Sequence, residues 1–270
     1  MWRKVLNIIS WVLLASYLGA GLWLTHQHLD ARAIQGMRIF LTDSLESHFV
    51  SRAEVSSILV AHGISTTGSL LNELNRDLVK NTVKTLPGVK DALVYTTPDG
   101  ILTIEVAQRT PVMRYISTAG SYYIDSDRRE MPLSENYSAR VLIVTGAEDK
   151  NFLKDSLFRV VSAIRNEAFL NALIGEIAVK TDHTLEIIPR VGDQRIFFGD
   201  AGNPEWKLTK LRAFYQNGLP NVGWDRYSRI DLRYSNQIVA RKWTKEERMA
   251  RDSVRAVRDT ANIQKPQKKV

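Results

Sequence analysis

The sequence predicts an α+β protein with one N-terminal transmembrane helix, a compact β-α-α-β-β domain, a mainly antiparallel α+β domain and a basic tail. Three observations support this. An uncharged apolar run opens the chain, two capped helices are followed by a strand–turn–strand pattern, and many short strands with few helices come after them. The predicted segments are a cytoplasmic N-terminus at 1–4, a transmembrane helix with its membrane exit at 5–29, the first domain at 36–107, the second domain at 108–243 and the tail at 244–270.

The N-terminal apolar run has the length of a membrane span. Residues 5–24 are 20 consecutive uncharged positions, and a helix needs roughly 20 residues to cross the hydrocarbon layer. A cleaved signal peptide is the alternative, but it usually has a shorter apolar region and an A-x-A-like site, whereas here the bulky Leu18 precedes Ala20. Arg3 and Lys4 before the run place the N-terminus in the cytoplasm. We therefore expect an inner-membrane protein with most of its chain in the periplasm or outside the membrane.

Local signals define the elements of the first domain. Ser51 and Glu54 have the spacing of a capping box, and Gly63 is expected to end the helix that they begin. Asn75 is a good cap for a second helix, which Pro87 and the following glycine stop. The predicted elements are a strand at 38–41, helices at 51–63 and 75–86, and strands at 89–96 and 101–106 joined by the turn at 97–100.

The second domain is predicted to be a mainly antiparallel sheet with inserted helices. Its strands are expected at 112–116, 121–124, 141–144, 176–179, 184–188, 194–198, 229–232 and 237–240, and its helices at 150–167 and 205–216.

The positive charge of the chain is concentrated in its tail. Residues 241–270 contain ten basic and four acidic side chains, which is +6 of the net charge of +8. The rest of the chain is nearly neutral, so the charge does not indicate a nucleic-acid partner. Thr244 and Glu247 have capping-box spacing, and Glu247 is expected to pair with Arg251. We expect a marginal, mobile helix from about 245 to 260, followed by disorder through Pro266.

No motif for catalysis or cofactor binding is recognisable. The chain has no cysteine, its five histidines lack the spacing of a helical zinc site, and neither a nucleophile elbow nor a phosphate loop is present. Asp125 and Asp127 are expected to form a polar turn and not a calcium loop. Acid pairs such as Asp225 and Asp231 leave a glycosidase open in principle. Two function classes remain: a non-enzymatic scaffold and a membrane-anchored cell-wall (peptidoglycan) enzyme.

Four short segments resemble the FtsQ/DivIB family of bacterial cell-division proteins. They are LPGVKDA at 86–92, RTPV at 109–112, YYID at 122–125 and IDLRY at 230–234, and the likeness covers about residues 1–243. The resemblance implies a POTRA domain at 36–107, a β domain at 108–243 and a non-enzymatic scaffold that links division proteins during septum formation. It also implies small single-span partners, FtsB-like and FtsL-like, besides other division proteins and the lipid bilayer, with no cofactor, metal, nucleic acid or small-molecule substrate.

The same resemblance implies a binding site on the last strand of the β domain, where a small partner adds a strand of its own. An edge strand suits this role because its unpaired N–H and C=O groups can be satisfied by an incoming strand. The alternative is that Ile238 and Val239 only complete the core. The candidate partner-binding residues are Arg233, Tyr234, Ile238, Val239, Ala240, Arg241 and Trp243.

Overall fold

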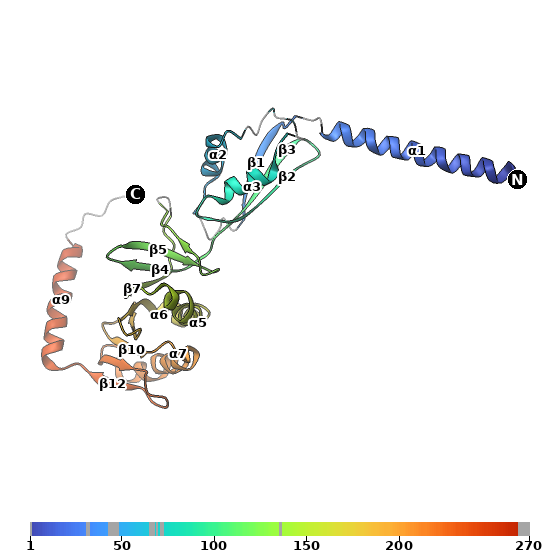
Figure 1. Cartoon of the computed structure of the whole chain (residues 1–270). Coiled ribbons are helices and arrows are strands. Elements are labelled where there is room, and N and C mark those ends of the chain that lie inside the picture. The colour runs from blue at the N-terminus through green and yellow to red at the C-terminus, as the bar shows by residue number, and fades with distance from the viewer. Residues whose placement is uncertain are drawn as a thin grey trace. The chain divides into compact units, whose positions relative to one another are not determined.

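The computed structural model describes residues 2–30, 33–42, 49–64, 68, 70, 73–134 and 137–263 (Figure 1). The chain forms two compact units. The first comprises residues 1–110 together with 134–139, and the second comprises 111–133 and 140–270. The two units divide between residues 110 and 111, whereas the predicted second domain begins at residue 108.

The chain begins with one long helix, α1 (Trp2–Asp30), over the segment predicted to cross the membrane. Among the residues that the structure describes, no helix has both the length and the apolar character needed to span a membrane.

The first unit has the predicted β-α-α-β-β order. Its elements are β1 (Gly36–Thr42), α2 (Arg52–Ala61), α3 (Arg76–Lys84), β2 (Val89–Thr96) and β3 (Ile101–Gln108). The sheet order is β1-β3-β2, with β1 parallel and β2 antiparallel to the central β3. Three alternate residues of β3, which share one face of the strand, are fully buried: Leu102, Ile104 and Val106. The two helices contribute Val55, Leu59, Val79 and Val83 to the buried residues of this unit.

The predicted helix caps of this unit are confirmed. The Ser51 hydroxyl accepts a hydrogen bond from the Glu54 amide at 3.1 Å, and the Glu54 carboxylate accepts one from the Ser51 amide at 2.7 Å. Asn75 accepts a hydrogen bond from the Leu78 amide at 2.9 Å. Gly63 follows the end of α2 with φ +69°, a conformation that favours glycine.

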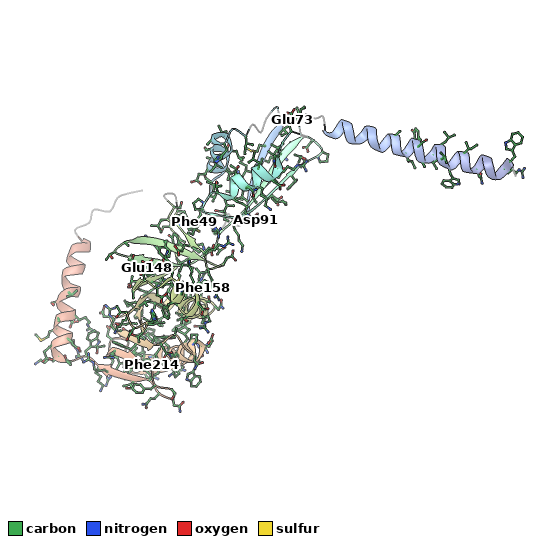
Figure 2. All side chains as sticks on the ribbon, viewed as in Figure 1. Phe49, Glu73, Asp91, Glu148, Phe158 and Phe214 are labelled. Atoms are coloured by element: carbon green, nitrogen blue, oxygen red, sulfur yellow. The ribbon has the colours of Figure 1, made fainter. Side chains whose placement is uncertain are left out.

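The segment 134–139 belongs to the first unit through an aromatic contact. Phe49, labelled in Figure 2, is 6% exposed and meets Tyr137 edge-on, with ring centroids 4.9 Å apart.

An ion pair links α3 to β2. Asp91, also labelled in Figure 2, lies 3.1 Å from the Lys84 ammonium. This contact lowers the pKa of Asp91, mainly through the hydrogen bond from Lys84.

The second unit is built on a nine-stranded sheet in the order β12-β11-β10-β9-β8-β7-β4-β5-β6. The strands are β4 (Pro111–Ser117), β5 (Gly120–Asp125), β6 (Glu130–Met131), β7 (Leu142–Gly146), β8 (Ile174–Val179), β9 (Leu185–Pro189), β10 (Arg195–Gly199), β11 (Tyr227–Asp231) and β12 (Val239–Lys242). Neighbouring strands are antiparallel except for the pairs β4–β7, β7–β8 and β10–β11. The prediction of a mainly antiparallel sheet is confirmed, and helices lie between the strands of two of the three parallel pairs, β7–β8 and β10–β11.

The helices of the second unit are interrupted more often than predicted. The stretch expected at 150–167 consists of α4 (Lys150–Phe152), the π-helical turn η1 (Leu153–Leu157) and α5 (Phe158–Arg165), followed by the unpredicted α6 (Ala168–Leu173). The stretch expected at 205–216 consists of α7 (Pro204–Ala213), the π-helical turn η2 (Phe214–Gly218) and the unpredicted α8 (Leu219–Val222). The two-residue β6 was also missed, because it is too short for a periodic pattern.

The tail continues as a helix, α9 (Lys245–Ile263). Its predicted capping box is confirmed, since Thr244 and Glu247 exchange hydrogen bonds of 3.0 and 3.2 Å. The predicted Glu247–Arg251 pair is wrong: Glu247 pairs with Arg241 at 2.6 Å, and Arg251 lies over the Trp243 ring instead. Residues 264–270, including Pro266 and its expected disorder, lie outside the described residues.

We expect deletion of residues 244–270 to change the stability of the second unit little. The described contacts between α9 and the strand before it are the exposed Arg241–Glu247 pair and the Arg251–Trp243 stack. An exposed ion pair contributes at most about 1 kcal/mol, and a cation–π contact contributes about 0.5–2 kcal/mol. The melting temperature of the truncated chain should therefore fall by only a few degrees. A much larger drop would mean that the tail packs more extensively on the body of the protein.

Candidate partner-binding edge

β12 is the last strand of the sheet and pairs on one side with β11, in antiparallel register Ile230 to Ala240 and Asp231 to Val239. Figure 1 shows this strand at the end of the second unit. Within the described part of the chain, no strand pairs with its other side. The outward backbone groups of β12 therefore provide a template for strand addition.

A bulge fixes the register of this edge. Between Tyr227 and Arg229 the pairing with β12 shifts, so that Ser228 is the extra residue of β11. The hydroxyl of Ser228, which is 6% exposed, lies 3.3 Å from the Arg241 carbonyl and 3.4 Å from the Lys242 carbonyl. Ser228 thereby satisfies its own hydroxyl inside the bulge and ties β11 to the end of β12.

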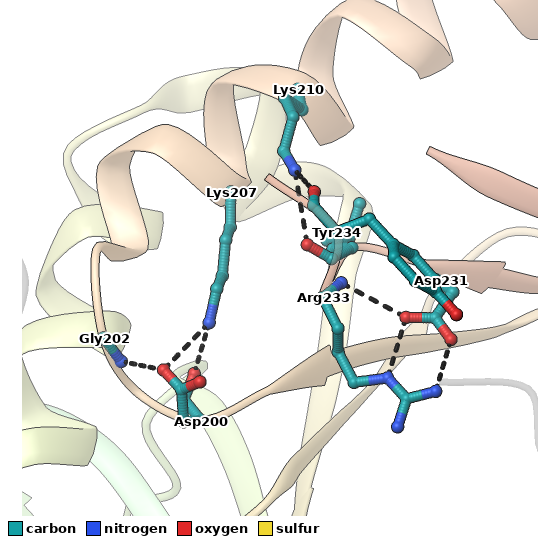
Figure 3. Close-up of polar contacts among 8 residues, drawn as sticks. Asp200, Gly202, Lys207, Lys210, Asp231, Arg233 and Tyr234 are labelled. Atoms are coloured by element: carbon teal, nitrogen blue, oxygen red, sulfur yellow. Dashed lines mark hydrogen bonds and ion pairs between the residues drawn. The ribbon is translucent and has the colours of Figure 1, made fainter. Parts of the chain in front are cut away.

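The loop that leads into β12 is held by α7. The Lys210 ammonium donates to the carbonyl of Tyr234 at 2.5 Å (Figure 3). It also lies 3.3 Å from the carbonyls of Leu232 and Ser235. The indole of Trp206 donates to the Ser235 carbonyl at 2.9 Å. Burial lowers the pKa of Lys210, and the nearby charge of Lys207 adds to this effect. These contacts satisfy the loop carbonyls between residues 232 and 235. β12 itself begins at Val239, two residues later than the predicted strand start at 237.

α7 is itself anchored to the turn that precedes it. Lys207 donates to the Asp200 carbonyl at 2.8 Å and to its carboxylate at 3.1 Å, and the Gly202 amide donates to the same carboxylate at 2.7 Å (Figure 3). The ammonium also lies 4.9 Å from the Phe198 ring centroid. The hydrogen bond from Lys207 is the main reason why the pKa of Asp200 is lowered.

Asp231, at the end of β11, is held by Arg233. The guanidinium donates to both carboxylate oxygens, at 2.9 and 2.6 Å, and the Arg233 amide donates to one of them at 3.2 Å (Figure 3). The stem of Arg233 crosses Gly199, where an added Cβ would lie 2.7 Å from Cγ of Arg233. The Asp231 side chain is only 8% exposed, and the hydrogen bonds from Arg233 are the main reason why its pKa is lowered.

A second arginine lines the same end of the sheet. Arg229 lies with its guanidinium 3.5 Å from the Phe197 ring centroid and 3.9 Å from the Asp231 carboxylate. Because Phe197 pairs with Asp231 across β10 and β11, the arginines and the aspartate form one charged cluster next to the edge strand.

The seven candidate residues have different surroundings. Tyr234 and Val239 are 47% and 43% exposed, whereas Ile238 is half-buried against the core. The alternative reading, completion of the core, therefore applies to Ile238 and not to Val239. Ala240 is half-buried within β12, Arg241 pairs with Glu247 at 2.6 Å, and Trp243 is half-buried beneath Arg251.

Two residues that position the loop were missed by sequence reasoning. Trp206 is 54% exposed although its indole N–H is bonded to the loop, and Lys210 contacts three carbonyl oxygens between residues 232 and 235. Both lie in α7, 22 to 29 positions before the residues that they contact, and an amphipathic pattern does not show which carbonyl a lysine or an indole will reach.

The acidic residues considered for chemistry have structural partners. Asp125 accepts hydrogen bonds from the amides of Asp127 and Arg129 at 2.9 and 2.8 Å, which is the predicted polar turn. Asp231 is bonded to Arg233 and is held ionised, which is unsuitable for a general acid. The described residues contain no group of three or more His, Cys, Asp or Glu side chains able to hold a metal ion.

The comparisons with known proteins agree with the two units. The family model described as "FtsQ/DivIB, C-terminal related" matches residues 110–241, and a POTRA-like domain model matches residues 32–107. A cell division protein FtsQ from Salinibacter ruber is 31% identical over 188 residues, which are 64% of this chain and 72% of that protein. One from Rhodothermus marinus is 30% identical over 190 residues, 65% of this chain and 68% of that protein. The chain belongs to the FtsQ/DivIB family of cell division proteins.

Proposed function

We propose that this protein is a non-enzymatic, membrane-anchored scaffold of the bacterial division machinery. In this proposal it binds small single-span division proteins, FtsB-like and FtsL-like, by adding a strand of the partner to β12. The observation that carries the proposal is the open edge of β12, which ends the sheet and has an exposed Val239 and an exposed Tyr234 beside it. Strand addition supplies main-chain hydrogen bonds, and such exposed side chains supply specificity.

The anchor is assigned to α1. Its aromatic side chains Trp2, Trp11 and Tyr17 are 80%, 70% and 77% exposed. Its described aliphatic side chains that are large and exposed range from 49% to 64%: Ile9, Val12, Leu13, Leu14 and Leu18. Large apolar side chains exposed along an isolated helix favour an apolar environment such as lipid. We place α1 in the inner membrane, and the chain from β1 onward in the periplasm or outside the membrane.

A pair of fusions tests this topology. A reporter that is active only outside the cytoplasm should work when fused after Leu86, because Arg3 and Lys4 keep the N-terminus inside. A reporter that is active only in the cytoplasm should work at the N-terminus alone. The reverse pattern of activities would refute the proposed orientation.

The binding proposal is tested with the extracytoplasmic segment of the FtsB-like partner. Tyr234→Ala should weaken binding by roughly 5–30-fold, because an exposed tyrosine at an interface commonly contributes about 1–2 kcal/mol. The variant should stay folded, since Lys210 holds the backbone carbonyl of Tyr234 and not its ring. Titration calorimetry measures the affinity.

Val191→Ala is the matched control, because Val191 is 57% exposed in the same unit and lies outside the edge. Equal affinities for Tyr234→Ala, Val191→Ala and the unmodified chain would contradict the proposed site. Arg233→Ala is a less specific test, because Arg233 forms an ion pair with the buried Asp231. That substitution therefore changes stability together with binding.

A further inference from the structure

The corner between β12 and α9 contains two buried hydrogen-bond donors without an acceptor. They are the indole Nε1 of Trp243 and Nη1 of Arg251, and neither has a partner among the described residues. Both belong to a single contact, because the Arg251 guanidinium lies 5.0 Å from the centroid of the Trp243 ring. Buried donors almost always have an acceptor, since otherwise the hydrogen bond to water is lost without replacement.

The other guanidinium nitrogens of this corner have hydrogen-bond acceptors, so the missing acceptors concern these two groups. The remaining guanidinium nitrogens of Arg251, Nε and Nη2, donate to the Asp252 carboxylate at 3.0 and 2.9 Å. The Arg251 side chain is 14% exposed. The direction of α9 is fixed by the Thr244–Glu247 capping box and by the Arg241–Glu247 pair at 2.6 Å.

The position of the corner relates it to the open edge. Trp243 directly follows Lys242, the last residue of β12, so a strand added along β12 ends beside the indole. A group at the end of that strand can therefore reach both donors. This part of the argument rests on the proposed strand addition.

The chemistry of the corner favours an anion that only accepts hydrogen bonds. Residues 241–252 carry five basic and three acidic side chains, and one of the two free donors belongs to a guanidinium. A carboxylate offers two oxygens that accept from different donors, and its bond to a guanidinium is charge-assisted. A lysine, an arginine or an amide N–H would bring a further donor to a place that lacks acceptors.

We propose that the β12–α9 corner binds a carboxylate of the partner segment that pairs with β12. Both donors are shielded in the free chain, so the carboxylate enters when the Arg251 side chain lifts from the indole. It then accepts one hydrogen bond from Nε1 of Trp243 and one from Nη1 of Arg251. The tail helix thereby serves as part of the partner-binding surface.

The test measures the affinity of the full-length chain, purified in detergent, for the extracytoplasmic segment of the FtsB-like partner. Trp243→Phe removes the N–H but keeps an aromatic ring, and Arg251→Gln removes the guanidinium. Each should weaken binding by roughly 10–100-fold. Arg248→Gln, the same substitution at an exposed position of the same helix, is the control and should change the affinity by less than about threefold.

The partner's carboxylate is located by replacing each of its acidic residues by the corresponding amide. One replacement should weaken binding as much as Arg251→Gln, and combining the two should cause no further loss, as in a coupled double-mutant cycle. Circular dichroism shows whether α9 survives Arg251→Gln. If α9 is lost in Arg251→Gln, the affinity of Trp243→Phe tests the carboxylate site, because that substitution leaves the sequence of α9 unchanged.

The failures of this proposal and of strand addition can be separated. If proline substitutions in β12 abolish binding but Trp243→Phe and Arg251→Gln behave like Arg248→Gln, the carboxylate site is refuted and strand addition stands. If proline in β12 has no effect on binding, both are refuted.

A titration with acetate and with phosphate, followed through the indole N–H resonance of Trp243, tests whether a free anion occupies the site. A shift at millimolar anion without the partner would assign the site to a free anion and overturn the proposal.

Discussion

Proline at one of the two neighbouring positions Val239 and Ala240 is expected to abolish partner binding in a folded protein, whereas proline at the other should damage the sheet. In an antiparallel pair, successive residues of an edge strand direct their N–H groups alternately to the paired strand and away from it. Both residues pair with β11, so one of the two amides faces outward. Proline removes that donor, and its ring obstructs an incoming strand, so that the affinity should fall by on the order of 100-fold or more.

The two variants are read together with a folding assay. The variant that melts like the unmodified chain identifies the outward amide, and its loss of affinity for the FtsB-like segment measures the contribution of strand addition. Gln237→Pro is the control, because Gln237 lies in the exposed loop before β12. Unchanged partner binding in the variant that stays folded would refute the edge as the binding site and direct attention to the surface of the first unit.

The elements of the first unit could be predicted because the signals that define them are local. The Ser51–Glu54 capping box, the Asn75 cap and the turn at 97–100 act over four residues or fewer, and all are present in the structure. The strands of the second unit were also located to within a few residues. Their order was not, because periodicity shows which residues are strand but not which strand lies beside which. The parallel pairing of β10 with β11 brings together residues more than 30 positions apart.

The same distinction applies to the candidate site. The resemblance to a known family located the last strand, but the groups that position the loop before it come from elsewhere: the Lys210 ammonium comes from α7, and Gly199 in β10 leaves room for the stem of Arg233. The predicted Glu247–Arg251 pair is wrong because other contacts compete for the Arg251 guanidinium. Spacing of four residues permits an ion pair worth only about 0.2–0.5 kcal/mol, and stacking on Trp243 together with the neighbouring Asp252 replaced it.

Asp231→Asn is expected to destabilise the second unit more than any other conservative change near the edge. The substitution keeps the shape of the side chain but replaces a buried carboxylate, bonded at 2.6 Å to Arg233, by an amide whose NH2 group cannot accept. Hydrogen bonds to charged groups contribute about 1.5–3 kcal/mol, which corresponds to a fall in melting temperature of roughly 4–12 °C for a unit of this size. Thermal unfolding at pH 7 measures the effect.

The pH dependence of this effect separates the charge from a simple packing defect. The hydrogen bonds from Arg233 lower the pKa of Asp231 in the folded state, so ionised Asp231 stabilises the fold above its unfolded pKa of about 3.9. This stabilisation is lost as the pH falls through the lowered folded pKa, because the carboxyl is then protonated in both states. The difference in the free energy of unfolding between Asp231→Asn and the unmodified chain should therefore be full at pH 5–7 and shrink below pH about 4.

Asp155→Asn is the matched control, since Asp155 pairs with Arg128 at 3.2 Å but is 64% exposed. It should lower the free energy of unfolding by at most about 1 kcal/mol. A difference for Asp231→Asn that stays constant down to pH 2 would attribute its effect to packing and not to the ion pair with Arg233.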